Sequence, residues 1–106
     1  MVSFRRLAGI VVLAGLCSCA PGSPGPEPGL TTAWRDYAAM PAERALAIAG
    51  DPGRKRWVTG ASGGHSSSAA AERAALEHCR VRREARRMQE DCVLYAVGDE
   101  IVWRGR

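Results

Sequence analysis

The first nineteen residues decide how much of this chain is available to fold. Arg5 and Arg6 precede an uninterrupted apolar run from Leu7 to Leu16, and small residues lead on to Cys19. A helix that spans a bilayer needs roughly 20 apolar residues, so this shorter run is typical of a cleaved export signal. We therefore predict that residues 1–18 are removed on export and that the folded domain is built from the rest.

The end of this leader resembles the lipobox of bacterial lipoproteins, which has a leucine three residues before the lipidated cysteine and a small residue directly before it. Leu16, Cys17 and Ser18 precede Cys19 here, with Cys17 in place of the usual alanine or serine. The resemblance implies lipidation at Cys19, with attached acyl chains that exceed the two anchors needed for stable membrane attachment. Ala20, in place of an aspartate, implies the outer membrane, facing the periplasm. The alternatives are an ordinary signal peptide cut after Ala20 and a short buried helix.

Proline and glycine dominate the segment that follows. Four of the six prolines fall within residues 20–29, which offer no side chain able to build a core. Because proline fixes φ, such a segment is semi-extended and solvated. We predict that residues 19–29 form a tether that holds a domain of residues 30–106 up to about 30 Å above the membrane.

The charge and size of the exported part limit its class. Loss of Arg5 and Arg6 leaves 13 basic residues against 11 acidic ones, a net charge near +2. This charge does not indicate binding to nucleic acid, which depends on neutralising many phosphates. A chain of this size buries only about 60% of its unfolded surface, so a covalent crosslink would contribute substantially to stability.

Periodicity and turn residues predict an α+β domain. A short helix capped by Thr31 or Thr32 runs to Met40, where Pro41 ends it. Strands at residues 45–49 and 56–61 flank a Gly-Asp-Pro-Gly turn, a long helix covers about residues 69–88, and strands at 92–97 and 100–103 follow. The predicted architecture is ββαββ, a small antiparallel sheet packed against one long helix, after the short N-terminal helix.

The apolar stripe of the long helix shifts partway along its length. At 100° per residue, the early apolar residues share one side: Ala71, Ala75, Leu76 and Cys79. The later ones share a side rotated from the first: Val81, Ala85 and Met88. Either the helix ends near Arg83, or its later turns pack elsewhere.

Cys79 and Cys92 are the only cysteines left after the leader is removed and Cys19 is lipidated. Export places them in an oxidising compartment, so a disulfide is expected. A bridge closing a loop of this length would add about 3 kcal/mol. The alternative is a pair of buried free thiols.

Several of these segments together resemble short exported bacterial domains. The segments are Ala45 to Ile48, the Asp-Pro-Gly turn, Arg56-Trp57 followed by Gly60-Ala61-Ser62-Gly63, the Ala-Glu-Arg-Ala-Ala-Leu-Glu-His-Cys run ending at Cys79, and the Cys-Val-Leu-Tyr-Ala-Val-Gly-Asp run starting at Cys92. Over about residues 44–103 the chain is similar to the group known as domain of unknown function 4189. The resemblance supports the predicted fold and the disulfide and implies no established activity.

Catalytic and metal-binding motifs are weak. Residues 60–64 match Gly-x-Ser-x-Gly around Ser62, the pattern of a nucleophile elbow. The chain lacks the parallel strands that hold such a serine, and the histidine considered as its base, His78, lies on the adjoining helix. His65 and His78 lack metal-site spacing, and Cys79 beside His78 points about 100° away. We expect neither metal nor cofactor and no enzyme activity, with a small serine hydrolase as the least favoured alternative.

Arginines recur along the long helix at Arg73, Arg80, Arg83 and Arg87. Glutamates interleave with them, which favours a solvated face over a binding surface. The alternative is a basic helix that contacts anionic lipid or another polyanion. The aromatic side chains of Trp57, Tyr95 and Trp103 are expected in the core or on the sheet.

These observations favour a non-enzymatic lipoprotein of the bacterial envelope. We expect it to be held to the membrane by its N-terminal lipid and to contact an envelope protein that the sequence does not identify.

Overall fold

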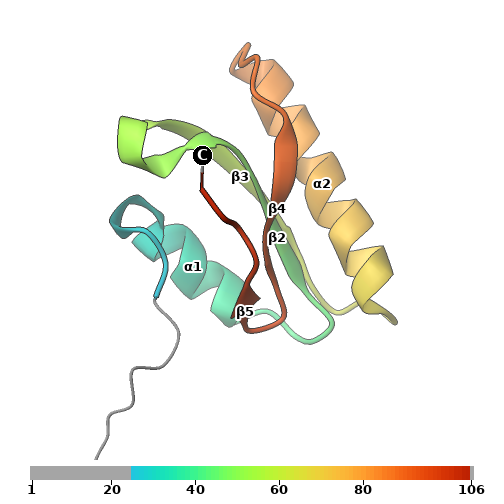
Figure 1. Ribbon diagram of the computed structural model, residues 1–106. Helices are drawn as coiled ribbons and strands as arrows, with labels where there is room; N and C mark the ends of the chain where they lie inside the picture. The colour runs from blue at the N-terminus through green and yellow to red at the C-terminus, as the bar shows by residue number, and fades with distance from the viewer. Residues whose placement is uncertain (1–24, 106) are drawn as a thin grey trace, which may run out of the picture.

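The computed structural model describes residues 25–105; the predicted signal at residues 1–18, Cys19 and the first half of the predicted tether lie outside these residues. The elements are η2 (Pro28–Leu30), α1 (Thr31–Ala38), β2 (Ala45–Asp51), η3 (Pro52–Arg54), β3 (Arg56–Ser62), α2 (Ser68–Ala85), β4 (Cys92–Val97) and β5 (Glu100–Ile101) (Figure 1). The predicted α+β class, with a small antiparallel sheet and two helices, is confirmed. Within the described residues, no helix has the length and apolar character needed to cross a membrane.

The sheet has four antiparallel strands in the order β3-β2-β4-β5. β2 and β3 pair without a break from Ala45 opposite Ser62 to Asp51 opposite Arg56. Among the strands that the structure describes, β2 is the one covered on both faces along most of its length, and its residues 45–50 are all buried. A strand buried on both faces needs no alternation of polar and apolar residues, which explains the continuous Ala-Leu-Ala-Ile-Ala run.

Two layers of helix cover the two faces of the sheet, α2 on one and η2 with α1 on the other (Figure 1). The α2 face is built from small buried side chains: Ala45, Ala47 and Ala49 from β2, and Ala71, Ala75 and Cys79 from α2. These small residues let the helix approach the strands closely. The other face carries larger buried side chains: Leu30, Tyr37, Leu46, Ile48 and Tyr95.

Tyr37 connects α1 to the sheet by core packing and hydrogen bonds. Its ring is fully buried, and its hydroxyl donates to the carbonyl oxygens of Gly98 and Arg44, at 2.8 and 3.2 Å. Burial raises the pKa of Tyr37 above its ordinary value, although the nearby Arg44 guanidinium opposes the rise. The prediction packed the sheet against one long helix. It did not include this second core, in which aromatic side chains pack against the opposite face of the sheet.

The N-terminal helices differ in detail from the prediction. A short helix, η2, precedes α1: Pro28 occupies its first helical position, and the Glu27 amide before it donates to the Tyr95 hydroxyl at 3.1 Å. Leu30, not Thr31 or Thr32, is the cap residue of α1, and it makes no side-chain capping bond. The helix ends at Ala38, two residues before the predicted end.

The C-terminal elements are shorter than predicted. α2 ends at Ala85 rather than Met88, and the last strand covers only Glu100–Ile101. Arg87 takes a left-handed φ of 57°, while the amides of Arg87 and Met88 donate to Glu84 and Arg83 carbonyls, each at 3.0 Å. This is a Schellman motif, with arginine where glycine is usual. It turns Met88 back into the core on the α2 face.

Cys79 and Cys92 are joined by a disulfide, as expected. Their Cα atoms are 6.1 Å apart, within the usual range for such bridges. Cys79 is a fully buried residue of α2, and Cys92 is the first residue of β4. The bridge therefore links the middle of the helix to the sheet it covers.

Candidate functional site

The strand order leaves β3 at an edge of the sheet. Residues of an antiparallel edge strand turn their N–H and C=O groups alternately toward the neighbouring strand and toward the free edge. Arg82 Nη1 donates to the Thr59 carbonyl at 3.1 Å, and His78 Nδ1 lies 2.9 Å from the Ala61 carbonyl, to which it donates. Trp57, Thr59 and Ala61 are therefore the residues that face the free edge.

Two grooves follow this edge and meet at Arg82. The larger, about 640 Å³, is lined by Gly29, Pro52, Lys55, Trp57, Val58, Thr59, Arg82, Ala85 and Arg86. The smaller, about 440 Å³, is lined by Met40, Gly60, Ala61, His78, Val81 and Arg82. We call the combined groove the β3 trough: its floor is β3, α2 forms one wall, and Gly29 and Met40 contribute to the other.

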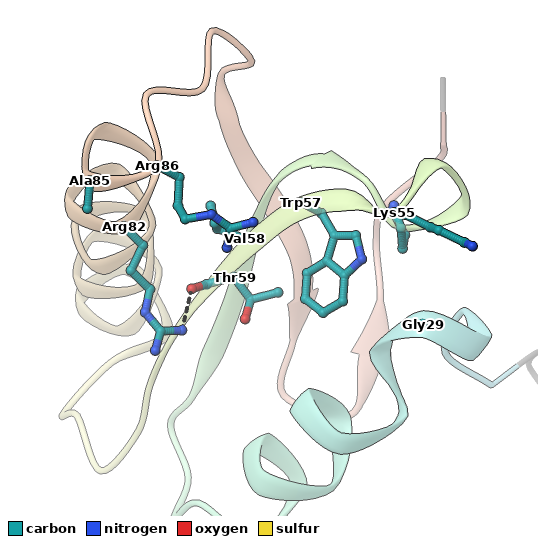
Figure 2. A pocket seen from close by; sticks show the side chains of 9 residues that line it. Gly29, Lys55, Trp57, Val58, Thr59, Arg82, Ala85 and Arg86 are labelled. Atoms are coloured by element: carbon teal, nitrogen blue, oxygen red, sulfur yellow. Dashed lines mark hydrogen bonds between the residues drawn. The ribbon is translucent and has the colours of Figure 1, made fainter.

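Positive charge gathers in the β3 trough. Lys55, Arg82 and Arg86 line it, and no aspartate or glutamate among residues 25–105 does so. Figure 2 shows Arg82 and Arg86 extending from α2 toward β3, with the half-buried Trp57 indole farther along the strand and Lys55 at the far end, its side chain pointing away from the two arginines. A concave surface lined by one sign of charge concentrates the field and attracts ligands of opposite charge.

The same wall also carries apolar surface. Val81 is 59% exposed, and Ala85 is exposed as well. Both belong to the rotated apolar stripe, whose third residue, Met88, is buried in the core on the α2 face. α2 ends at Ala85, two residues after Arg83, which agrees with the alternative that placed its end near Arg83. Val81 and Ala85 line the trough instead of that core.

The arginines singled out from the sequence lie elsewhere. Arg80 forms an ion pair with Glu77, and Arg83 donates to the Glu90 carbonyl at 3.3 Å and lies 3.6 Å from the Asp91 carboxylate. Arg73 is exposed near the start of α2, and Arg87 belongs to the turn after it. None of the four lines the β3 trough.

The sequence did not point to the cations that line the trough. Arg82 and Arg86 have i,i+4 spacing and so share a helix face, but Lys55 is far away in sequence. Lys55 occupies a left-handed turn with a φ of 61° at the end of η3. The i,i+4 spacing of Arg82 and Arg86 was the available signal. The glutamates interleaved along the helix favoured a solvated face instead.

Ser62 meets a different histidine from the one considered. Its Oγ lies 2.6 Å from His65 Nε2, whereas His78 binds the Ala61 carbonyl. The amides of Gly64 and His65 already donate to the carbonyls of Pro41 and Glu43. These two amides therefore cannot stabilise an oxyanion, and the Ser62–His65 hydrogen bond closes the loop between β3 and α2.

Titratable side chains do not assemble a metal centre in the described part of the chain: within residues 25–105, no three of the histidines, cysteines, aspartates and glutamates gather closely enough to hold an ion.

Comparisons with protein-family models, with curated proteins and with solved structures each found no match.

Proposed function

We propose that this chain is an envelope lipoprotein anchored at Cys19, similar to domain of unknown function 4189, whose domain is a non-enzymatic binding module. The module binds an anionic partner in the β3 trough. One observation carries this proposal: Lys55, Arg82 and Arg86 come from two separate elements to line one groove, and no carboxylate side chain of the described residues lines it. This surface replaces the predicted arginine stripe as the candidate anion contact.

The trough offers several exposed cations rather than one. An isolated surface ion pair contributes about 0.2–1 kcal/mol, which is too little for specific binding. Three exposed cations line one groove beside the partly buried Trp57 ring, so their individually small contributions can act together on one ligand.

Charge reversal in the trough is expected to weaken anion binding. Residues 20–106 include every helix and strand described here, and fluorescein-labelled polyglutamate serves as the probe. The double change Lys55→Glu and Arg86→Glu should lower affinity roughly tenfold or more, as expected for loss of two ion pairs and gain of two repulsions. Fluorescence anisotropy at low salt measures the effect, which should shrink as salt is raised.

The matched control is Arg73→Glu with Arg80→Glu, which changes the net charge equally on the same helix but outside the trough. We expect polyglutamate affinity to change less than threefold. If the control weakens binding as much as the trough variant, net charge or the arginine stripe governs the interaction and the proposed site is wrong.

Anchoring is tested at the predicted lipidation site. Cys19→Ser should leave an unprocessed precursor when the full chain is produced in a Gram-negative bacterium, whereas Cys17→Ser should be processed normally. Electrophoretic mobility and membrane fractionation report both steps. Normal processing and unchanged membrane association of Cys19→Ser would refute the lipid anchor.

A further inference from the structure

The occupant of the β3 trough can be specified further, on the basis of the proposed function. We infer that the trough takes an extended acidic peptide segment of a partner protein, which adds to β3 as a fifth strand. Strand addition to an exposed sheet edge is a recurring mode of peptide recognition, in which main-chain hydrogen bonds supply affinity and alternate side chains supply specificity.

The spacing of the α2 side chains favours an extended chain. His78, Arg82 and Arg86 recur every four residues, a rise of about 6 Å along a helix. Alternate residues of a strand recur every 6.6 Å or so. This match lets His78 reach Ala61 and Arg82 reach Thr59, while Arg86 lines the same groove as Trp57.

A peptide with an acidic residue at every second position presents carboxylates at that same spacing. Lying along β3, it would place successive carboxylates beside Arg82 and Arg86 and its intervening side chains toward the trough's other surfaces. Val81 and Ala85 supply apolar contact on the same wall. The cation repeat therefore fits an extended acidic chain better than a ligand with a single anionic group.

The hydrogen bonds that the outward carbonyls of β3 now make can be replaced by those of an added strand. In the free domain Arg82 and His78 cap the outward carbonyls of Thr59 and Ala61. An added strand would donate its own N–H groups to these carbonyls and accept from the outward N–H groups of β3. Arg82 and His78 would then be released to pair with the peptide's carboxylates. In the absence of a partner, the same cap protects the edge from pairing with other chains.

The shape of the trough disfavours a membrane surface as the occupant. The outward backbone groups of β3 lie on the floor, with α2 on one side and Gly29 and Met40 on the other. A flat layer of headgroups would touch the exposed cations but would not reach this floor. A single extended chain reaches both the cations and the backbone.

The test uses residues 20–106 and a labelled peptide of eight residues that alternates glutamate and valine. Two further versions carry N-methyl groups on alternate amides, one on the odd positions and one on the even positions. Both keep the charge and the side chains of the parent peptide. If the peptide adds to β3, one version loses affinity at least tenfold and the other stays within threefold, because only one set of amides faces the strand.

Ala61→Pro makes the same test from the protein side. Proline is tolerated on an edge strand where the lost N–H faces outward, so pairing with β2 is retained and circular dichroism should be unchanged. Peptide affinity should fall at least fivefold, whereas Ala61→Val should retain it. If Ala61→Pro does not fold, the two N-methyl peptides decide the question alone.

The outcomes separate the inference from the function on which it rests. Equal binding by both N-methyl peptides, or no binding of the parent while polyglutamate still binds in the trough, overturns strand addition but leaves the anion site standing. Binding to phosphatidylglycerol vesicles that is lost in the Lys55→Glu and Arg86→Glu variant, without peptide binding, identifies a lipid headgroup instead. If the unaltered domain binds neither polyglutamate, nor the peptide, nor the vesicles, the proposed function itself is wrong.

Discussion

Replacing Gly60 with alanine is expected to lower the free energy of unfolding by about 3 kcal/mol or more, at the upper end of the usual range for overpacking a core. A Cβ at this position would stand 2.6 Å from the Ala75 carbonyl oxygen and 2.8 Å from the Cys79 Cα, and closer still to the Cys79 amide nitrogen. All three are backbone atoms of α2, so no side chain can rotate to relieve the clash. The helix would have to move away from β3, losing buried contact along the α2 face.

The disulfide increases this expected effect. Cys79 is bonded to Cys92, so the segment of α2 that must move is the one that is covalently fixed to β4. Urea unfolding followed by circular dichroism measures the loss. Gly53→Ala is the matched control, because the nearest atom to its Cβ is the Asp51 carboxylate at 3.3 Å and the site is exposed; its effect should stay within about 0.5 kcal/mol. A loss below about 1 kcal/mol for Gly60→Ala would contradict the close helix–strand approach.

The chain's local patterns predicted its elements better than their arrangement. The Asp-Pro-Gly turn, the alanine-rich helix and the Cys92 strand are local signals, and each is present in the structure. The second core could not be predicted in the same way. Tyr37 reaches Arg44 and Gly98, and the latter contact is long-range and carries no periodic signature.

The candidate site was hidden for a related reason. The β3 trough exists because β3 is an edge strand, and strand order is a tertiary property that hydrophobic patterning does not encode. Lys55 joins Arg82 and Arg86 only after α2 packs across the sheet. The arginines that looked regular in sequence, Arg80 and Arg83, are instead held by acidic neighbours in the fold.

Reduction of the Cys79–Cys92 disulfide is expected to lower the free energy of unfolding by about 3 kcal/mol. The bridge closes a segment with a sequence separation of 13. A crosslink across a loop of this length lowers the conformational entropy of the unfolded chain, which raises the free energy of that state by about 3 kcal/mol. Domains of this size are stable by about 5–10 kcal/mol, so the bridge supplies a large share. The reduced domain should therefore unfold at markedly lower urea concentration.

Residues 20–106 contain only these two cysteines, so no other thiol can respond to the reductant. Urea unfolding is compared with and without a phosphine reductant, and a Cys79→Ala, Cys92→Ala variant is the control, since its unfolding should not respond to the reductant. A thiol count on denatured, unreduced protein exported without its lipid should give none. Two reactive thiols would contradict the bridge. Because Cys79 anchors the helix that carries Arg82 and Arg86, the reduced protein should also lose polyglutamate binding at urea concentrations where the oxidised protein still binds.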